Sequence, residues 1–197
     1  MNPNNKRSRD FKNLVLEKLS RTHISVPLIL FSGYSGALLY YSITYTELSM
    51  VITGSLFALG LLAFTLTEYL VHRYVFHMDT SAELGKKTQY SIHGVHHQYP
   101  KDKTRLAMPP IASVTLATAL LLIFRLVMGD LVFSFLPGFL LGYAGYLFVH
   151  YIIHAYQAPK NVFRILWIHH GIHHFKNNER AFGVSSPLWD YVFRTMP

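Results

Sequence analysis

The chain has 197 residues, of which 51% are hydrophobic and 14% are charged, against roughly 25% charged residues in a soluble domain. It contains no cysteine, which excludes disulfides, thiolate zinc sites and cysteine-ligated iron–sulfur clusters. The formal net charge is +8, but the basic residues form blocks between long apolar runs, not the continuous stripe typical of nucleic-acid-binding proteins. This pattern indicates an integral membrane protein with no nucleic-acid partner.

Four apolar runs are long enough to cross a bilayer as helices, which requires about 20 residues. They cover residues 24–43, 50–71, 110–128 and 131–153. The first run could also be interpreted as a cleavable signal peptide, but its length and the missing small-residue cleavage site favour a membrane helix. In the fourth run, Gly138 and Gly142 have the G-x-x-x-G spacing that lets membrane helices approach closely. We expect an all-α integral membrane protein with four transmembrane helices.

Lysine and arginine are unevenly distributed between the segments that flank these runs. Six lie in the first 23 residues, six lie between residues 72 and 109, and five follow residue 153. The short connections between the paired runs contain none, and only Arg125 departs from the pattern. Because cytoplasmic segments carry the excess of basic residues, we expect both termini and residues 78–109 to face the cytoplasm. The predicted domains are a basic cytoplasmic segment, residues 1–23, and a membrane domain, residues 24–197.

Eleven of the twelve histidines fall in four clusters, each at the predicted cytoplasmic end of a membrane helix or in a cytoplasmic segment. The clusters are His72 and His77; His93, His96 and His97; His150 and His154; and His169, His170, His173 and His174. Residues three or four positions apart share one face of an α-helix, so most of these imidazoles point together. His72 and His77 are five positions apart and would diverge on a regular helix, which indicates a distorted helix end.

So many convergent imidazoles favour a buried multinuclear metal site. Histidine tags and loose metal-binding tracts are contiguous, whereas these clusters are separated along the chain. A bis-histidine haem needs fewer histidines. A transporter places ionisable residues near the bilayer midplane, whereas these histidines lie at the predicted membrane edge. Imidazole suits zinc, copper, iron and nickel, and the number of nitrogen ligands exceeds what one ion accepts. Zinc needs about three protein ligands, and the sequence has no H-E-x-x-H or Glu-x-x-His motif. We therefore expect two iron ions that activate O2, which zinc can replace in purified protein.

The motifs H-x4-H, H-x2-H-H, H-x3-H and H-x2-H-H occur in this order along the chain. QYPKDKTRLAMPP follows the second motif, and FKNNERAFGVSSPLWDYVF follows the last. With these segments the chain resembles the fatty acid hydroxylase (sterol desaturase) superfamily over roughly residues 66–196, and within it the fatty acid/ceramide 2-hydroxylase branch. The resemblance implies four transmembrane helices and a cytoplasmic, histidine-rich helical cap that holds a dimetal centre.

The resemblance also implies the residues of the site. The implied metal ligands are His72, His77, His93, His96, His97, His150, His154, His170, His173 and His174. His169 lies outside the motif and is expected beside the ligands, not among them. Glu68 precedes His72 by one helical turn, and we expect it to accept a hydrogen bond from that imidazole and orient it. No separate acid or base is assigned, and Asp190 is expected mainly to pack.

Members of this branch hydroxylate C2 of a long acyl chain with O2 and two electrons. The resemblance thus implies 2-hydroxylation of a long-chain fatty acid or of the N-acyl chain of a sphingolipid. Some relatives carry a fused cytochrome b5 domain, which the residues before the first span are too few to form, so we expect a separate cytochrome b5-like or ferredoxin-like electron donor. The alternatives are a carotenoid or sterol hydroxylase or desaturase, and a non-catalytic metal-binding or metal-transport membrane protein.

Overall fold

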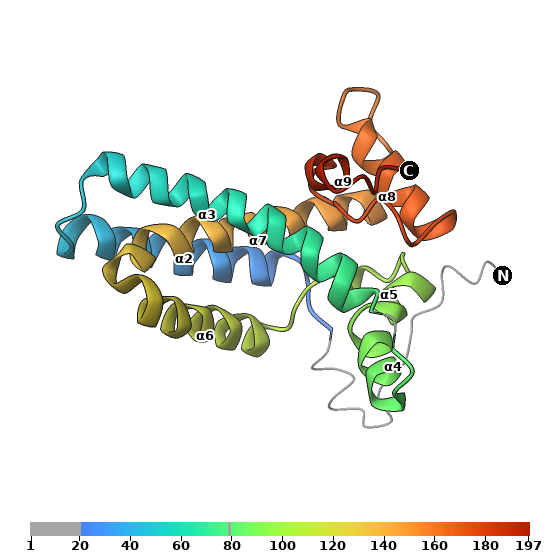
Figure 1. Cartoon of the computed structure of the whole chain (residues 1–197), viewed down its shortest axis with the longest axis horizontal. Coiled ribbons are helices and arrows are strands. Elements are labelled where there is room, and N and C mark those ends of the chain that lie inside the picture. The colour runs from blue at the N-terminus through green and yellow to red at the C-terminus, as the bar shows by residue number, and fades with distance from the viewer. Residues whose placement is uncertain (1–20, 79) are drawn as a thin grey trace.

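The computed structural model describes residues 21–78 and 80–197, and within these residues every regular element is a helix. Four helices are long: α2 (Ser25–Tyr45), α3 (Met50–Val71), α6 (Pro110–Met128) and α7 (Val132–Ala155). They run side by side and form one end of the molecule, while shorter helices gather at the other end (Figure 1). The predicted basic segment, residues 1–23, lies almost wholly outside the described residues, and its role stays a prediction.

The long helices match the four predicted apolar runs to within a few residues, and local signals fix several of their ends. At the start of α3, the side chain of Ser49 accepts a hydrogen bond from the backbone N–H of Ile52. At the start of α6, Pro110 occupies the first turn, where its missing N–H costs no helical hydrogen bond. A 3-10 turn, η5 (Gly129–Leu131), separates α6 from α7, and Gly129 adopts the positive φ of 57° that glycine tolerates.

Among the described residues, three apolar segments are long enough to cross a membrane: Ser25–Tyr45, Met50–Phe76 and Pro110–Ala155. The third has 46 residues and doubles back at η5, so α6 and α7 run in opposite directions (Figure 1). The connection between α2 and α3 lies at the same end of the bundle as η5 (Figure 1). The C-terminal ends of α3 and α7 therefore meet at the opposite end, beside the shorter helices.

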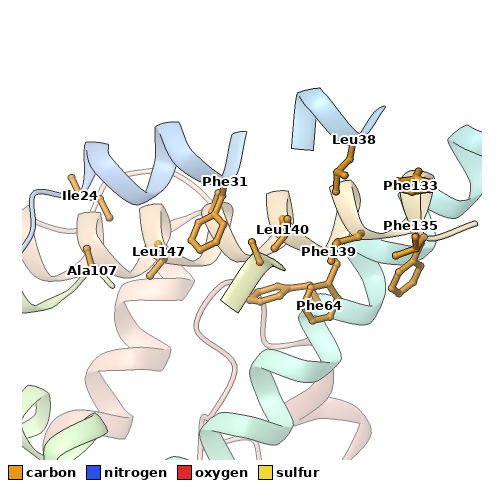
Figure 2. Packing of buried hydrophobic residues seen from close by; sticks show 14 residues of the cluster. Ile24, Phe31, Leu38, Phe64, Ala107, Phe133, Phe135, Phe139, Leu140 and Leu147 are labelled. Atoms are coloured by element: carbon orange, nitrogen blue, oxygen red, sulfur yellow. The ribbon is translucent and has the colours of Figure 1, made fainter. Parts of the chain in front are cut away.

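The central helix of the bundle is α7, whose buried side chains pack against those of its neighbours. Figure 2 shows Phe31 and Leu38 of α2 and Phe64 of α3 packed against Phe139 and Leu140 of α7. Because lipid tails are as apolar as these side chains, close packing holds such helices together better than the exclusion of water does. The close fit of α7 to its neighbours fixes where its C-terminal end lies.

Glycines allow α3 and α7 to approach closely. A Cβ atom added at Gly138 would lie 2.0 Å from the carbonyl oxygen of Phe57, and one added at Gly60 would lie 2.1 Å from that of Phe135. A Cβ atom at Gly142 would lie 2.7 Å from a side-chain atom of α3. The expectation drawn from Gly138 and Gly142 is thus confirmed, and Gly60 is the partner on α3 that the sequence pattern did not indicate.

The shorter elements form a cap, residues 72–109 and 156–197, over the ends of α3 and α7 (Figure 1). Its α-helices are α4 (Glu83–Gln89), α5 (Val95–Gln98), α8 (Arg164–Phe175) and α9 (Leu188–Val192). Two π-helical segments, η2 (His72–Phe76) and η3 (Tyr90–Gly94), and the 3-10 helix η4 (Lys103–Arg105) complete it. Since η2 continues α3 without a break, the long helix carries its last residues directly into the cap.

Candidate metal centre

Ten histidines lie together where the cap meets the long helices, in two groups of five. The first pentad comprises His72, His77, His93, His97 and His173. The second pentad comprises His96, His150, His154, His170 and His174. Within each pentad, the candidate ligand nitrogens all lie within 4.8 Å of one another. These are the ten histidines that the sequence predicts as ligands, and their binding of metal stays a prediction.

The imidazoles of the first pentad face one another through their Nε2 atoms. The Nε2 atom of His93 lies 3.1 Å from that of His72 and 3.0 Å from that of His97. The Nε2 atoms of His77 and His173 are 3.0 Å apart. A neutral imidazole has a single N–H, so one Nε2 atom cannot donate to two neighbours that face it. The Nε2 atoms therefore converge as metal ligands would, and they do not form a satisfied hydrogen-bond network.

The second pentad repeats this arrangement. The Nε2 atom of His96 lies 3.0 Å from that of His150 and 3.1 Å from that of His174. The Nε2 atoms of His154 and His170 are 2.8 Å apart. The two pentads adjoin each other, because the rings of His97 and His174 stack with their centroids 4.2 Å apart.

Two imidazoles of the first pentad have a tautomer that the structure fixes. Nδ1 of His72 contacts the carbonyl oxygen of Phe182, and Nδ1 of His173 lies 2.8 Å from that of Arg180. A carbonyl oxygen only accepts hydrogen bonds, so each Nδ1 carries the proton and donates. In the neutral ring, Nε2 then has a free lone pair that points into the pentad.

The protonation state of the cap histidines suits metal binding. Burial, together with neighbouring imidazoles, lowers the pKa of His77 to about 4 and that of His97 to about 3. The same two causes lower the pKa of His93, His96 and His170 well below its usual value. These rings are therefore neutral near pH 7, and their nitrogen lone pairs are available without the loss of a proton.

The donor atoms and their spacing fit metal ions. At a metal–nitrogen distance of about 2.1 Å, two ligands at right angles lie about 3.0 Å apart. The six Nε2–Nε2 separations, three in each pentad, range from 2.8 to 3.1 Å. Neutral imidazoles suit divalent iron, zinc, copper and nickel. Each pentad thus has a donor set suited to one ion.

The π-helical segment η2 explains the spacing that a regular helix does not. His72 and His77 are five positions apart, and the turn of a π-helix closes with a hydrogen bond between residues five apart. Residues at this spacing therefore lie near one another along the same side of the segment. The ring centroids of His72 and His77 are 5.2 Å apart, so both imidazoles join one pentad. The predicted distortion of this helix end is confirmed.

A segment that we call the strap, residues 180–185, provides both carbonyl groups that bind the first pentad. Asp190 accepts hydrogen bonds from the amides of Phe182 and Gly183, at 2.9 and 2.7 Å. Glu68 of α3 accepts hydrogen bonds from the next two amides, Val184 and Ser185, at 2.7 and 2.8 Å. Two buried carboxylates thus fix the backbone that orients the imidazoles.

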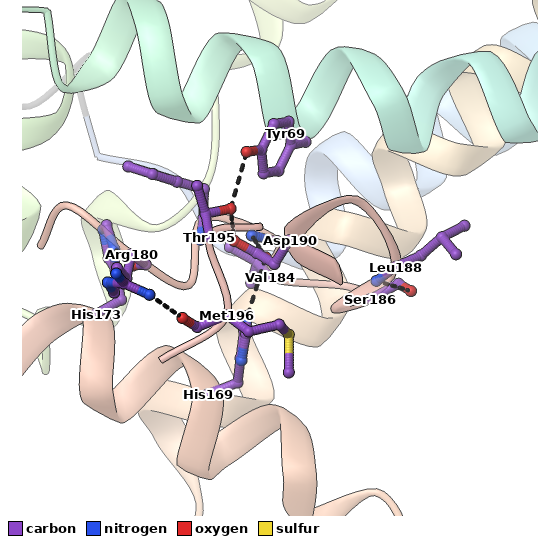
Figure 3. A network of polar contacts seen from close by, with 12 residues as sticks. Tyr69, His169, His173, Arg180, Val184, Ser186, Leu188, Asp190, Thr195 and Met196 are labelled. Carbon is purple, nitrogen blue, oxygen red and sulfur yellow. Dashed lines mark hydrogen bonds and ion pairs between the residues drawn. The ribbon is translucent and has the colours of Figure 1, made fainter. Parts of the chain in front are cut away.

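Asp190 is fully buried and links α9 to α8 and to the chain end. It accepts hydrogen bonds from the hydroxyl of Thr195 at 2.7 Å and from His169 at 2.9 Å, and Thr195 also contacts Tyr69 of α3 (Figure 3). Burial opposes its ionisation, but hydrogen bonds from His169, Thr195 and the strap amides hold its pKa below the usual value. Sequence reasoning assigned Asp190 mainly to packing and missed this role.

The expectation for Glu68 was wrong in its contact. Its carboxylate binds Val184 and Ser185, and the Nδ1 proton of His72 goes to the carbonyl of Phe182. Two backbone N–H groups of the strap converge on this carboxylate, and a carbonyl oxygen of the strap accepts the hydrogen bond from the imidazole of His72. His169 lies outside both pentads and reaches Asp190 instead, so it acts on the site through the strap.

A cavity of about 420 Å³ lies against the second pentad. His154, His170 and His174 form part of its wall, together with the end of α7, one face of α8, and Pro100, Lys101 and Lys103. Apolar and aromatic side chains, among them Trp167 and Phe175, make up much of the remaining wall. The cavity offers a small molecule or the end of a lipid a place beside the histidines, at the boundary between the long helices and the cap.

The long apolar helices and the two imidazole pentads define a histidine-rich helical protein whose helices are long enough to cross a membrane. A family model described as fatty acid hydroxylase matches residues 57–195, and the chain belongs to this family. It is 37% identical over 145 residues to dihydroceramide fatty acyl 2-hydroxylase FAH2 of Arabidopsis thaliana, which covers 73% of this chain and 61% of that protein. It is 33% identical over 210 residues to fatty acid 2-hydroxylase of Rattus norvegicus, which covers 95% of this chain and 56% of that protein.

The fold is also similar to a solved structure, that of full-length Scs7p in which only the hydroxylase domain is visible. The TM-score is 0.86 at 30% sequence identity, and the match covers 95% of this chain and 71% of the other. The chain thus spans between about half and two thirds of the length of the two curated relatives above. The activities in the names of these relatives belong to longer proteins.

Proposed function

We propose that this protein is an O2-dependent di-iron hydroxylase that acts at C2 of a long-chain fatty acid or of the N-acyl chain of a sphingolipid. The observation that carries the proposal is the pair of imidazole pentads at the end of the apolar bundle that meets the cap, in a chain of the fatty acid hydroxylase family. The relatives named above, a dihydroceramide fatty acyl 2-hydroxylase and a fatty acid 2-hydroxylase, support C2 as the position.

We propose that each pentad holds one ion, so that all ten histidines are ligands. The lone pairs fixed on Nε2 and the ligand-like nitrogen spacing support this assignment. In the bound state, iron would supply the activation of O2 and the transfer of one oxygen atom to a C–H bond, while the second oxygen atom leaves as water with two electrons and two protons. The protein's part is to hold the ligands, position the acyl chain and exclude bulk water.

We propose four membrane crossings, by α2, α3, α6 and α7, in the membrane domain of residues 24–197. The turn at η5 supports this count, because one helix of 46 residues would be about 69 Å long, roughly twice the hydrocarbon thickness of a bilayer. Both termini and the cap then face the cytoplasm, as the basic residues indicate. Electrons come from a separate cytochrome b5-like or ferredoxin-like protein.

In this arrangement the acyl chain lies along the apolar helices, and its carboxyl end occupies the cavity beside the second pentad. His154, His170 and His174 line the cavity, so carbons near the carboxyl end come closest to the ligands. Carbons far down the chain remain among the long helices. The placement of the cavity at the membrane boundary therefore supports chemistry at C2 over chemistry at the middle of the chain.

The test is mass spectrometry of whole-cell lipids after expression in a host that lacks 2-hydroxylated lipids. Expression of the protein should produce 2-hydroxylated fatty acids or 2-hydroxyacyl sphingolipids. The matched control is the His96→Ala variant, which loses the histidine at the centre of the second pentad and should give no product at equal protein level. Oxidised sterols or carotenoids without 2-hydroxyacyl lipids would replace the proposed substrate with the alternative one. No oxidised lipid of any class would refute an enzymatic role.

A further inference from the structure

The two pentads differ in what supports the outer nitrogens of their imidazoles. In the first pentad, Nδ1 of His72 and Nδ1 of His173 donate to strap carbonyls. In the second pentad, the buried Nδ1 atoms of His170 and His174 have no hydrogen-bond partner among the described residues. The two pentads do not differ in burial, because each contains two half-buried histidines and three buried ones.

The support of the first pentad extends well beyond the two carbonyls. The strap is fixed by Glu68 from α3 and by Asp190 from α9, through four backbone amides. A further hydrogen bond, from the amide of Ala181 to the carbonyl of Thr195, ties the strap to the chain end. The imidazoles of His72 and His173 are therefore held in the ligating orientation before any ion arrives. The outer nitrogens of His170 and His174 have no such support.

We propose that the two metal positions are unequal: the first pentad binds its ion more tightly than the second, and the cavity lies beside the weaker position. This rests on the proposed dimetal site. The loss of an outer hydrogen-bond partner typically weakens metal binding 10–100-fold, so the two dissociation constants should differ by about tenfold or more. Protein that has lost metal then retains one ion in the first pentad and none beside the cavity.

The experiment is equilibrium dialysis of the purified, detergent-solubilised full chain against buffered Zn²⁺ concentrations, with bound metal measured by elemental analysis. The expected result is two binding steps of one ion each, separated by about tenfold or more in free Zn²⁺. His154→Ala should remove the weaker step, and His77→Ala should remove the tighter one. A single step of two ions, or removal of the tighter step by His154→Ala, would overturn the proposal.

A second variant tests the strap without removing a ligand. Glu68→Ala removes the side-chain oxygen that accepts hydrogen bonds from the amides of Val184 and Ser185, and it should shift only the tighter step to higher free Zn²⁺, by about 10–100-fold. The matched control is Glu179→Ala, which makes the same chemical change at an exposed position next to the strap and should shift neither step. If Glu68→Ala shifts neither step or both steps equally, the strap does not discriminate between the pentads.

The metal titration and the lipid assay test the two proposals independently. Two unequal Zn²⁺ steps in a protein that makes no 2-hydroxylated lipid would refute the proposed function and leave the unequal pentads standing. Product formation with one cooperative step of two ions would support the function and refute the inequality. Zn²⁺ alone is sufficient as the probe, because the argument concerns the orientation of imidazoles and not redox chemistry.

Discussion

Each imidazole has two nitrogens, and at the scale of single residues the partner of the outer nitrogen decides what the inner one can do. The carbonyl of Phe182 places the proton of His72 on Nδ1, and the lone pair on Nε2 then faces the other histidines. His169 shows the opposite case, because its Nε2 is bound to Asp190 and is not available to an ion. Adjacent histidines on one helix thus have different tasks.

This difference gives a prediction for His169 and His170. Neighbours on an α-helix point about 100° apart, and His170 lies in the second pentad while His169 does not. His170→Ala should therefore lower the metal content to about one ion per chain and abolish hydroxylation, since a lost ligand costs more than the 10–100-fold of an outer partner. His169→Ala should retain both ions and part of the activity.

Elemental analysis and product formation, measured on both variants at equal protein level, check this prediction. Loss of metal from His169→Ala together with full metal content in His170→Ala would reverse the assignment of ligands in α8. The four histidine clusters were predictable because residue type and spacing are local properties of the sequence, and the resemblance to the family implied the ten histidines of the pentads. The strap was not, because its carbonyls are backbone groups, and the one that binds His72 lies 110 residues away.

At the scale of elements, the long helices follow from the apolar runs, and their boundaries were predictable to within a few residues. The π-helical form of η2 was not predictable in detail, because the five-residue spacing of His72 and His77 shows only that a regular helix fails. The pairing of α3 with α7 also needed the structure. A G-x-x-x-G pattern shows a small face but not the helix that lies against it.

The closeness of α3 and α7 gives a prediction for two glycines on one helix. A Cβ atom at Gly138 would lie 2.0 Å from the carbonyl oxygen of Phe57, whereas one at Gly145 would have nothing within 4 Å. Gly138→Ala should lower the free energy of unfolding by about 1–3 kcal/mol, because the helices must separate or shift. Gly145→Ala should leave it unchanged or raise it by up to about 1 kcal/mol, because alanine favours the helix.

Thermal unfolding in detergent, followed by size-exclusion chromatography of each variant, measures the difference. The two substitutions are chemically identical and lie on the same helix, so an effect of detergent or of helix propensity would act on both. Equal stability of the two variants would contradict the close crossing of α3 and α7. Because the end of α7 carries His150 and His154, we also expect Gly138→Ala to reduce metal binding at the second pentad.

At the scale of the whole molecule, the two ends of the long axis differ in structure and in charge. The connection between α2 and α3 and the turn η5 lie at one end, and the cap with both pentads lies at the other (Figure 1). Charge follows the same axis in the part of the chain that the structure describes: apart from Arg125, the lysine and arginine residues there are Arg21 and those of the cap, from Arg73 onward. This asymmetry was predictable from the sequence because it depends on residue type and order alone.

This difference between the two ends predicts which positions a water-soluble reagent reaches from outside the cell. The chain has no cysteine, so a single introduced cysteine is the only thiol to label. Glu47, between α2 and α3, and Asp130, in η5, are exposed at the end away from the cap, whereas Ser91 is exposed within the cap. Because the cap carries the basic residues, Glu47→Cys and Asp130→Cys should react with an impermeant maleimide in intact cells. Ser91→Cys should react only after the membrane is permeabilised.

Asp130 makes this experiment decisive for the number of crossings. If α6 and α7 each cross the membrane, Asp130 emerges on the same side as Glu47, and both cysteines label to the same extent. If α6 and α7 do not form a membrane hairpin, Asp130→Cys is protected in intact cells while Glu47→Cys still reacts, and the four-crossing proposal is wrong. Labelling of Ser91→Cys from outside, with protection of the other two, would instead place the cap and its histidines outside the cell and exclude a cytoplasmic electron donor.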